Sequence, residues 1–225
     1  RHNKTLPHHP GLNGLWYLYN FAPVDANRIL TDPSWTKAIF VRNPYKRLIS
    51  GYMDKAIKRN GLYLQNHCCG VRAVKTSARL TSLLKCQPFF EGVRSKEKKP
   101  LVTLGEFVRE VIPVCNDVHW RPQRFRIQQK YWPHIQFVGN FDRVADDAKQ
   151  LLQKIGAWEK FGKTGWDKQG EQASIFETRD TVHHVTNSSQ NHQVEIDTEL
   201  HASVEKIYGA DFSCPLLQLS RAEEH

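Results

Sequence analysis

The sequence has no long hydrophobic run. None of its apolar stretches approaches the roughly 18 residues that a membrane-spanning helix needs, and no basic-then-apolar leader opens the chain. Its five cysteines include no Cys-x-x-Cys pair, and Cys68 and Cys69 are adjacent, which is poor spacing for metal ligands. The sequence therefore predicts neither a transmembrane segment within these residues nor a metal site.

The composition is that of an ordinary globular protein. Hydrophobic residues make up 40% of the 225 residues and charged residues 24%, which excludes a collagen-like, coiled-coil or wholly disordered chain. This length suits one large domain, so we predict a single domain over residues 1–225. Residues 61–100 lack clear periodicity and are rich in Lys and Arg, and we predict that they form a basic excursion within that domain.

Positive charge is in excess and is concentrated in three segments. The formal net charge is +9, and residues 42–60, 72–99 and 121–130 carry more than this whole excess. Such segregation favours a polyanionic partner, whether a phosphorylated cofactor, a sulfated or uronic sugar, nucleic acid or anionic lipid. The alternative is a solvated basic face. No nucleic-acid-binding motif is present, so a nucleic-acid-binding module is the weaker prediction.

The first strand–helix unit begins near residue 36. Residues 36–42 are mostly apolar and predict a short buried strand. Asn43 is a good N-cap and Pro44 suits the first helical position, so a helix is expected to follow directly. Apolar residues then recur at helical spacing up to about Arg59, on a face made of Tyr45, Leu48, Ile49, Tyr52 and Ala56.

A second strand–helix unit follows in the other half of the chain. Residues 134–141 predict a strand, Asp142 is expected to cap the next helix, and Gly156 is expected to end it. Two further helices are predicted over residues 103–112 and 197–208. This alternation predicts an α/β fold with a central parallel sheet flanked by helices, in which ligands bind at the carboxyl ends of the strands.

Arg42 and Ser50 are the candidate anion ligands. Arg42 stands at the carboxyl end of the first strand, and Ser50 lies two turns into the helix, well away from its apolar face. A guanidinium and a hydroxyl beside the start of a helix make a site for a group of phosphate size. The alternative is that Arg42 pairs with a surface carboxylate while Ser50 faces water.

Four segments in register resemble one family. They are Val41–Tyr52, Asp117–Gln123, Phe137–Asp142 with the helix to Gly156, and His184–Phe212 with its Tyr-x-x-Asp-Phe ending. Together they are similar to sulfotransferases that use 3′-phosphoadenosine 5′-phosphosulfate (PAPS). The resemblance is strongest to the Golgi carbohydrate sulfotransferases of the chondroitin/dermatan 4-O and HNK-1 type, and it spans roughly residues 28–215.

The resemblance implies a function and a location. The fold would be the P-loop-NTPase-like sulfotransferase fold, with PAPS as co-substrate, no metal, and Arg42 and Ser50 holding the 3′-phosphate. The acceptor would be a carbohydrate hydroxyl. The location would be the Golgi lumen, in a type II membrane protein anchored by a segment outside this chain. No Gly-rich or Lys-x-Gly-x-Ser/Thr-like loop for the 5′-phosphosulfate precedes Arg42, and we expect that strand and loop to lie upstream of Arg1.

His119 is the candidate general base for this transfer, since imidazole titrates near neutral pH and suits proton abstraction from an alcohol. Trp120 is predicted to stack on a sugar ring. Arg121 and Arg124 are predicted to pair with a carboxylate or sulfate of an anionic acceptor. The alternative for His119 and Trp120 is a packed pair that closes the core.

Two further observations bear on the function. Sequons at Asn3 and Asn187 hint weakly at a glycoprotein of the secretory route. The lack of a donor loop between Arg1 and Arg42 keeps open a non-catalytic, polyanion-binding relative that retains the fold but not the donor site.

Overall fold

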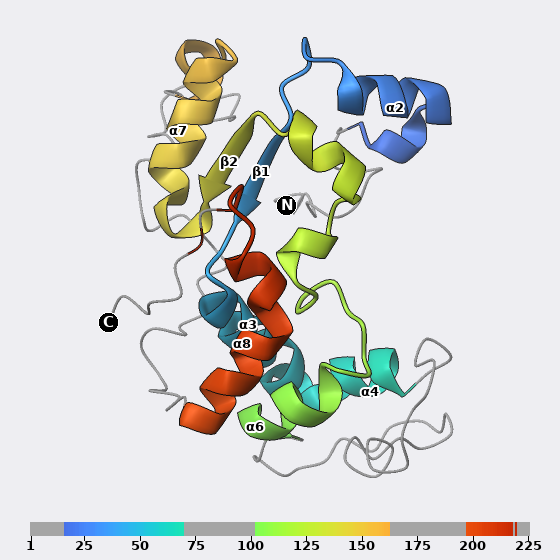
Figure 1. Ribbon diagram of the computed structural model, residues 1–225, viewed down its shortest axis with the longest axis vertical. Helices are drawn as coiled ribbons and strands as arrows, with labels where there is room; N and C mark the ends of the chain where they lie inside the picture. The colour runs from blue at the N-terminus through green and yellow to red at the C-terminus, as the bar shows by residue number, and fades with distance from the viewer. Residues whose placement is uncertain (1–15, 70–101, 163–196, 218, 220–225) are drawn as a thin grey trace, which may run out of the picture.

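The structure of the protein, a computed structural model, describes residues 16–69, 102–162, 197–217 and 219 (Figure 1). Within these residues, strands β1 (Ala38–Val41) and β2 (Phe137–Asn140) form a two-stranded parallel sheet. The register pairs Ala38 with Phe137 and Val41 with Asn140. Because the strands are parallel and in this register, both end at the same edge of the sheet.

The strand–helix order of the first unit forms as the sequence predicts, but the expectation of a buried strand is wrong, because Ala38 and Phe40 are exposed and only Val41 of β1 is buried. Helix α3 (Pro44–Tyr52) begins directly after the strand, and the Asn43 side chain accepts hydrogen bonds from the backbone N–H groups of Tyr45 and Lys46. The expected regular helix to Arg59 is replaced beyond α3 by a π-helical turn, η2 (Met53–Ile57), and a 3₁₀ turn, η3 (Lys58–Gly61).

The predicted excursion over residues 61–100 is partly helical. Gly61 takes a left-handed conformation, with φ of 73°, and starts helix α4 (Leu62–Cys68). A residue with a side chain would be strained at that φ, so glycine permits the turn from η3 into α4. Residues 70–100 of the excursion lie outside the described residues.

The β2 unit differs from the prediction in its cap. A 3₁₀ turn, η7 (Phe141–Arg143), separates β2 from α7 (Val144–Lys154). The prediction that Asp142 caps the helix is wrong: the Asn140 side chain accepts a hydrogen bond from Asp142 N–H, and no side chain caps α7. The predicted end at Gly156 is confirmed, with a φ of 68°.

The remaining elements surround these two units. Thr103 caps α6 (Leu104–Glu106), which continues as the π-helical turn η4 (Phe107–Val111). The last helix, α8 (Thr198–Phe212), begins where predicted and runs four residues further than residue 208. The others are η1 (Leu18–Asn20), α2 (Pro23–Thr31), η5 (Gln123–Phe125), η6 (Gln129–His134) and η8 (Trp158–Gly162).

The main core lies among helices rather than on the sheet. Figure 1 shows α7 beside the sheet, with α3, α4, α6 and α8 gathered beyond the carboxyl ends of the strands. The buried core residues of this helical group include Tyr45, Leu48, Phe107, Val204 and Tyr208. A smaller cluster covers the sheet. The predicted α/β class with a parallel sheet is confirmed, and in the described part of the chain no helix is both long and apolar enough to cross a membrane.

Candidate functional site at the carboxyl edge of the sheet

Arg42 follows β1, and its backbone is held on both sides. Its N–H donates to Gln123 Oε1 at 2.9 Å, and its carbonyl accepts from Gln123 Nε2 at 2.8 Å. Gln123 is 8% exposed and is itself fixed, because its N–H donates to the buried Asp211 carboxylate at 2.9 Å. The orientation of Arg42 is therefore set by tertiary contacts.

The Arg42 side chain is partly buried, and it forms no ion pair within the described part of the chain. Its Nε is buried and has no hydrogen-bond partner among the described residues, and the guanidinium lies 5.4 Å from the centroid of the Phe141 ring. Burial lowers the pKa of Arg42, against the opposing charge of Asp142. Asp142, whose charge favours the Arg42 cation, forms its own ion pair with Lys46 at 3.3 Å, and among the described residues no carboxylate forms an ion pair with Arg42. An unmet buried donor is costly, and an added anion would satisfy it.

Helix α3 connects Arg42 to the loop that carries His119. Arg47 donates from its two terminal nitrogens to the carbonyls of Arg121 and Val118, both at 2.8 Å. At Gly51, a Cβ atom would lie 3.6 Å from the carbonyl oxygen of His119, so helix and loop are in close contact there. Ser50 is the residue before Gly51 and is partly buried. The structure thus brings α3, with Ser50 on it, against the His119 loop.

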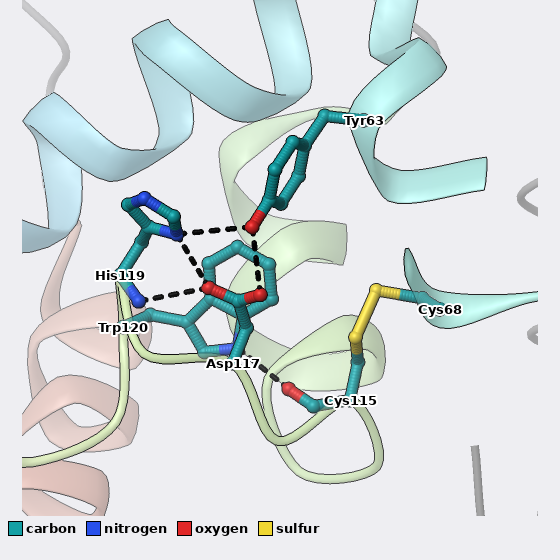
Figure 2. The surroundings of a disulfide bond; sticks show 6 residues. All are labelled: Tyr63, Cys68, Cys115, Asp117, His119 and Trp120. Carbon is teal, nitrogen blue, oxygen red and sulfur yellow. Dashed lines mark hydrogen bonds and ion pairs between the residues drawn. A yellow bond between two sulfur atoms is a disulfide. The ribbon is translucent and has the colours of Figure 1, made fainter. Parts of the chain in front are cut away.

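His119 lies in a hydrogen-bonded network with Asp117 and Tyr63 (Figure 2). Its Nδ1 is 2.6 Å from Asp117 Oδ1, and its N–H donates to the same oxygen at 2.8 Å. The Tyr63 hydroxyl donates to Asp117 Oδ2 at 2.8 Å and lies 3.1 Å from His119 Nδ1. The His119 side chain is 39% exposed and that of Asp117 only 10%. An imidazole held at one nitrogen and open to solvent suits proton transfer.

The charge of the network resides on Asp117. Burial opposes ionisation, but hydrogen bonds from His119 and Tyr63 outweigh it and lower the pKa of Asp117 to about 2. Burial and the hydrogen bond to Asp117 raise the pKa of the Tyr63 phenol. Near neutral pH the network therefore holds a carboxylate and a protonated phenol.

Sequence reasoning missed both partners of His119. Tyr63 belongs to α4, inside the stretch predicted as an excursion, and no local pattern marked it. Asp117 stands two residues before His119, and this spacing could have identified it as a partner. An Asp side chain often accepts a hydrogen bond from the backbone N–H two residues later, as Asp117 does from His119. A disulfide between Cys68 and Cys115 ties α4 to this loop, close to both residues.

Trp120 is a core residue and not a sugar platform. It is 1% exposed, its Nε1 donates to the Cys115 carbonyl at 2.6 Å, and its ring meets Phe107 edge to face. No ring face remains for a sugar, so the stacking prediction for Trp120 is not supported. The packed-pair alternative holds for Trp120 but not for the more exposed His119.

The structure separates the two candidate acceptor arginines. Arg121 donates a hydrogen bond from its Nε to Asn116 Oδ1 at 2.8 Å. It also lines a groove of about 660 Å³ between η4 and α8. Arg124 lies over the Trp132 ring, at 5.5 Å from its centroid, and borders a different hollow. One acceptor group therefore cannot be assigned to both side chains on this geometry.

Helix α8 anchors the segment that joins these residues. The Tyr208 hydroxyl donates to the Trp120 carbonyl at 2.7 Å. The Asp211 carboxylate accepts from the N–H groups of Gln123 and Arg124, at 2.9 and 2.7 Å. The position of the His119 loop relative to Arg42 thus depends on a helix that lies some ninety residues later in the chain.

Acid should weaken the fold through Asp117. Its pKa is about 2 in the folded protein against an ordinary 3.8, so its stabilising contribution is complete above the ordinary value and is lost as pH falls toward 2. We expect a contribution of about 1–2 kcal/mol, because solvent reaches the network. Urea unfolding at about pH 7 and about pH 3 should show a smaller loss of stability for Asp117→Asn than for the wild type.

Asp146→Asn is the control for this measurement. Asp146 is an exposed carboxylate on α7. The Asp146→Asn variant should show the same pH dependence of the free energy of unfolding as the wild type. If the free energy of unfolding of Asp117→Asn falls between about pH 7 and about pH 3 by as much as that of the wild type, Asp117 is not the source of the acid sensitivity.

The fold and the site define an α/β protein in which an arginine with a buried, unpartnered Nε follows the first strand, and in which a histidine–aspartate pair lies on a loop packed against the next helix. The sulfotransferase family model matches residues 6–214, and the chain belongs to this family. The resemblance of the sequence to sulfotransferases is thereby confirmed.

Curated relatives refine the comparison. The chain is 30% identical to human carbohydrate sulfotransferase 9 over 131 residues, which is 55% of this chain and 26% of that protein. It is 30% identical to human carbohydrate sulfotransferase 8 over 128 residues, or 55% of this chain and 27% of that protein. The matched part thus spans only about a quarter of the length of these relatives. No solved structure matches the chain.

Proposed function

We propose that this protein transfers a sulfuryl group from PAPS to a hydroxyl of a carbohydrate acceptor. The observation that carries the proposal is the buried Arg42 Nε without a partner, at the edge of the sheet where ligands of α/β proteins bind. Family membership and the printed names of the relatives support the reaction class and the acceptor class.

Arg42 and Ser50 would hold the 3′-phosphate of the nucleotide. A guanidinium pairs with phosphate through short, charge-assisted hydrogen bonds, and these would satisfy the buried donor. The contact of α3 with the His119 loop, at Arg47 and Gly51, would keep the phosphate site and the base in a fixed relation.

His119 would act as the general base. In the transfer, the bond between sulfur and the bridging phosphate oxygen breaks as a bond from the acceptor oxygen to sulfur forms. The acceptor hydroxyl must lose its proton, and the exposed side of the His119 ring can take it. The reaction thus yields a sulfate ester, the nucleotide bisphosphate and a protonated His119.

The acceptor would lie along the groove between η4 and α8. Its lining combines three basic side chains, those of Arg109, Arg121 and Lys206, with apolar ones, which suits an anionic sugar. We retain Arg121 as the candidate acceptor ligand. Arg124 is the less suitable candidate because its guanidinium packs on Trp132.

The proposed location is the Golgi lumen, in a type II membrane protein. The Cys68–Cys115 disulfide supports an oxidising compartment, where such bonds persist. The two sequons agree with this location.

The test is the binding of 3′-phosphoadenosine 5′-phosphate, measured by calorimetry. Arg42→Ala should weaken binding by about 10–100-fold, which corresponds to the loss of a charge-assisted hydrogen-bonded pair. Adenosine 5′-phosphate lacks the 3′-phosphate, so its weaker binding should be unaffected by the substitution.

Arg28→Ala is the matched control, since Arg28 is an exposed arginine on α2 and its loss changes the net charge equally. An equal loss of affinity in both variants would favour the alternative, a non-catalytic polyanion binder that responds only to total charge. Binding to RNA with no preference for the 3′-phosphate would instead revive the nucleic-acid module. Sulfate transfer by the full-length gene product would exclude both.

A further inference from the structure

Three side chains from two segments distant in the sequence form one hydrogen-bonded network. Tyr63 comes from α4, and Asp117 and His119 come from the loop after η4. The contacts are at 2.6 Å from His119 Nδ1 to Asp117 Oδ1, 2.8 Å from the Tyr63 hydroxyl to Asp117 Oδ2, and 3.1 Å from that hydroxyl to Nδ1.

Donor and acceptor chemistry fixes where the protons are. An ionised carboxylate can only accept, so both the Tyr63 hydroxyl and His119 Nδ1 must donate to Asp117. The low pKa of Asp117, about 2, keeps that carboxylate ionised. Once Nδ1 carries the hydrogen, a neutral His119 has its lone pair on Nε2. Among the described residues, no hydrogen bond engages that nitrogen.

We infer that Tyr63 and Asp117 are positioning residues that hold neutral His119 in its Nδ1-protonated tautomer, with Nε2 presented as the basic atom. Asp117 selects the tautomer by accepting from Nδ1. Tyr63 occupies the second carboxylate oxygen and thereby fixes the rotation of Asp117. The inference rests on the proposed function for its catalytic meaning, whereas the tautomer itself is a property of the free protein.

The surroundings of Tyr63 make this hydroxyl rigid. Its ring stacks on His67 at a centroid distance of 4.0 Å, and Lys55 Nζ lies 4.7 Å from its centroid. Lys55 also pairs with Asp54, at 2.7 Å, so the charges facing Tyr63 are balanced locally. The Cys68–Cys115 disulfide joins the two segments next to the network. Few rotations of the Tyr63 ring are compatible with these contacts.

The experiment measures the His119 tautomer by NMR of the chain labelled with ¹⁵N in histidine, without ligand. The two ring nitrogens of a neutral histidine have distinct shifts for the protonated and the unprotonated state. The spectrum of His119→Ala assigns the signals among the 11 histidines. We expect Nδ1 protonated and Nε2 unprotonated with a preference of at least about tenfold, as for a hydrogen bond to a charged group.

Two isosteric variants then separate the roles. Asp117→Asn should abolish the preference or reverse it, because an amide nitrogen can donate to Nδ1. Tyr63→Phe keeps the ring contacts and should reduce the preference. In the full-length gene product, both should lower kcat for sulfate transfer, by about tenfold or more, while leaving the affinity for 3′-phosphoadenosine 5′-phosphate unchanged.

Tyr131→Phe and Asp146→Asn are the controls, since both residues lie outside the network. A wild-type His119 protonated at Nε2 overturns the inference, and this measurement does not require either network variant, Asp117→Asn or Tyr63→Phe, to fold. A tautomer that is unchanged in both network variants overturns it as well. If the tautomer behaves as expected but Arg42→Ala leaves nucleotide binding intact, the proposed function fails while the positioning of His119 stands.

Discussion

Replacing Asp211 by asparagine should lower the free energy of unfolding by about 3 kcal/mol, because it breaks a buried, charged hydrogen-bond network. Asp211 is fully buried and accepts from the N–H groups of Gln123 and Arg124. Asparagine turns an N–H₂ group toward one of these donors and removes the negative charge that favours the Arg47 cation. Thermal unfolding should show a midpoint lowered by about 6–12 °C.

The same substitution should also affect the site. Gln123 holds both backbone groups of Arg42, so loosening Gln123 should weaken the binding of 3′-phosphoadenosine 5′-phosphate even where the protein remains folded. Asp147→Asn is a comparison at another buried carboxylate, which accepts from Asn140 N–H beside β2. A variant at Asp211 that unfolds like the wild type would show that α8 does not anchor the loop.

Replacing His119 by alanine should lower the rate of sulfate transfer by about 10²–10⁴-fold, the usual contribution of a general base. The ring is exposed on one side and held by Asp117 on the other, so its loss removes the proton acceptor and leaves Arg42 in place. The measurement is the initial rate of transfer to a carbohydrate acceptor by the full-length gene product. Nucleotide affinity should stay within about twofold of the wild type, because the base does not touch the 3′-phosphate.

His134→Ala serves as the control for the loss of an imidazole, since His134 ends η6 and lies outside the network. It should retain the wild-type rate. A rate of sulfate transfer that His119→Ala leaves intact would remove His119 from the mechanism. A parallel loss of nucleotide affinity would indicate instead that the loop had moved.

The local parts of the site could be predicted because their signals are local. The strand before Arg42, the Asn43 cap and the apolar face of α3 depend on neighbours within a few residues, and the structure reproduces them. The position of Arg42 at the carboxyl edge follows from that strand–helix boundary. The sequence could not show which member of the adjacent pair His119 and Trp120 is buried. The structure buries Trp120 and leaves His119 more exposed.

Other parts depend on contacts between distant residues. Tyr63 reaches Asp117 across 54 positions, and Asp211 reaches Gln123 across 88. Neither pairing leaves a periodic pattern, because side chains that meet through a folded chain need no fixed spacing. The Cys68–Cys115 pairing was likewise undetermined, since five cysteines permit several connectivities.

The sequence by itself determined the two strand–helix units, the excess of basic charge and the placement of one arginine and one histidine in segments typical of sulfotransferases. Only the tertiary structure decided that the Arg42 Nε is buried without a partner among the described residues, that Trp120 fills the core, and that Tyr63 and Asp117 form hydrogen bonds around His119. The physical reason is range: caps and apolar periodicity act over a few residues, whereas burial and hydrogen-bond partners are settled when distant segments pack together.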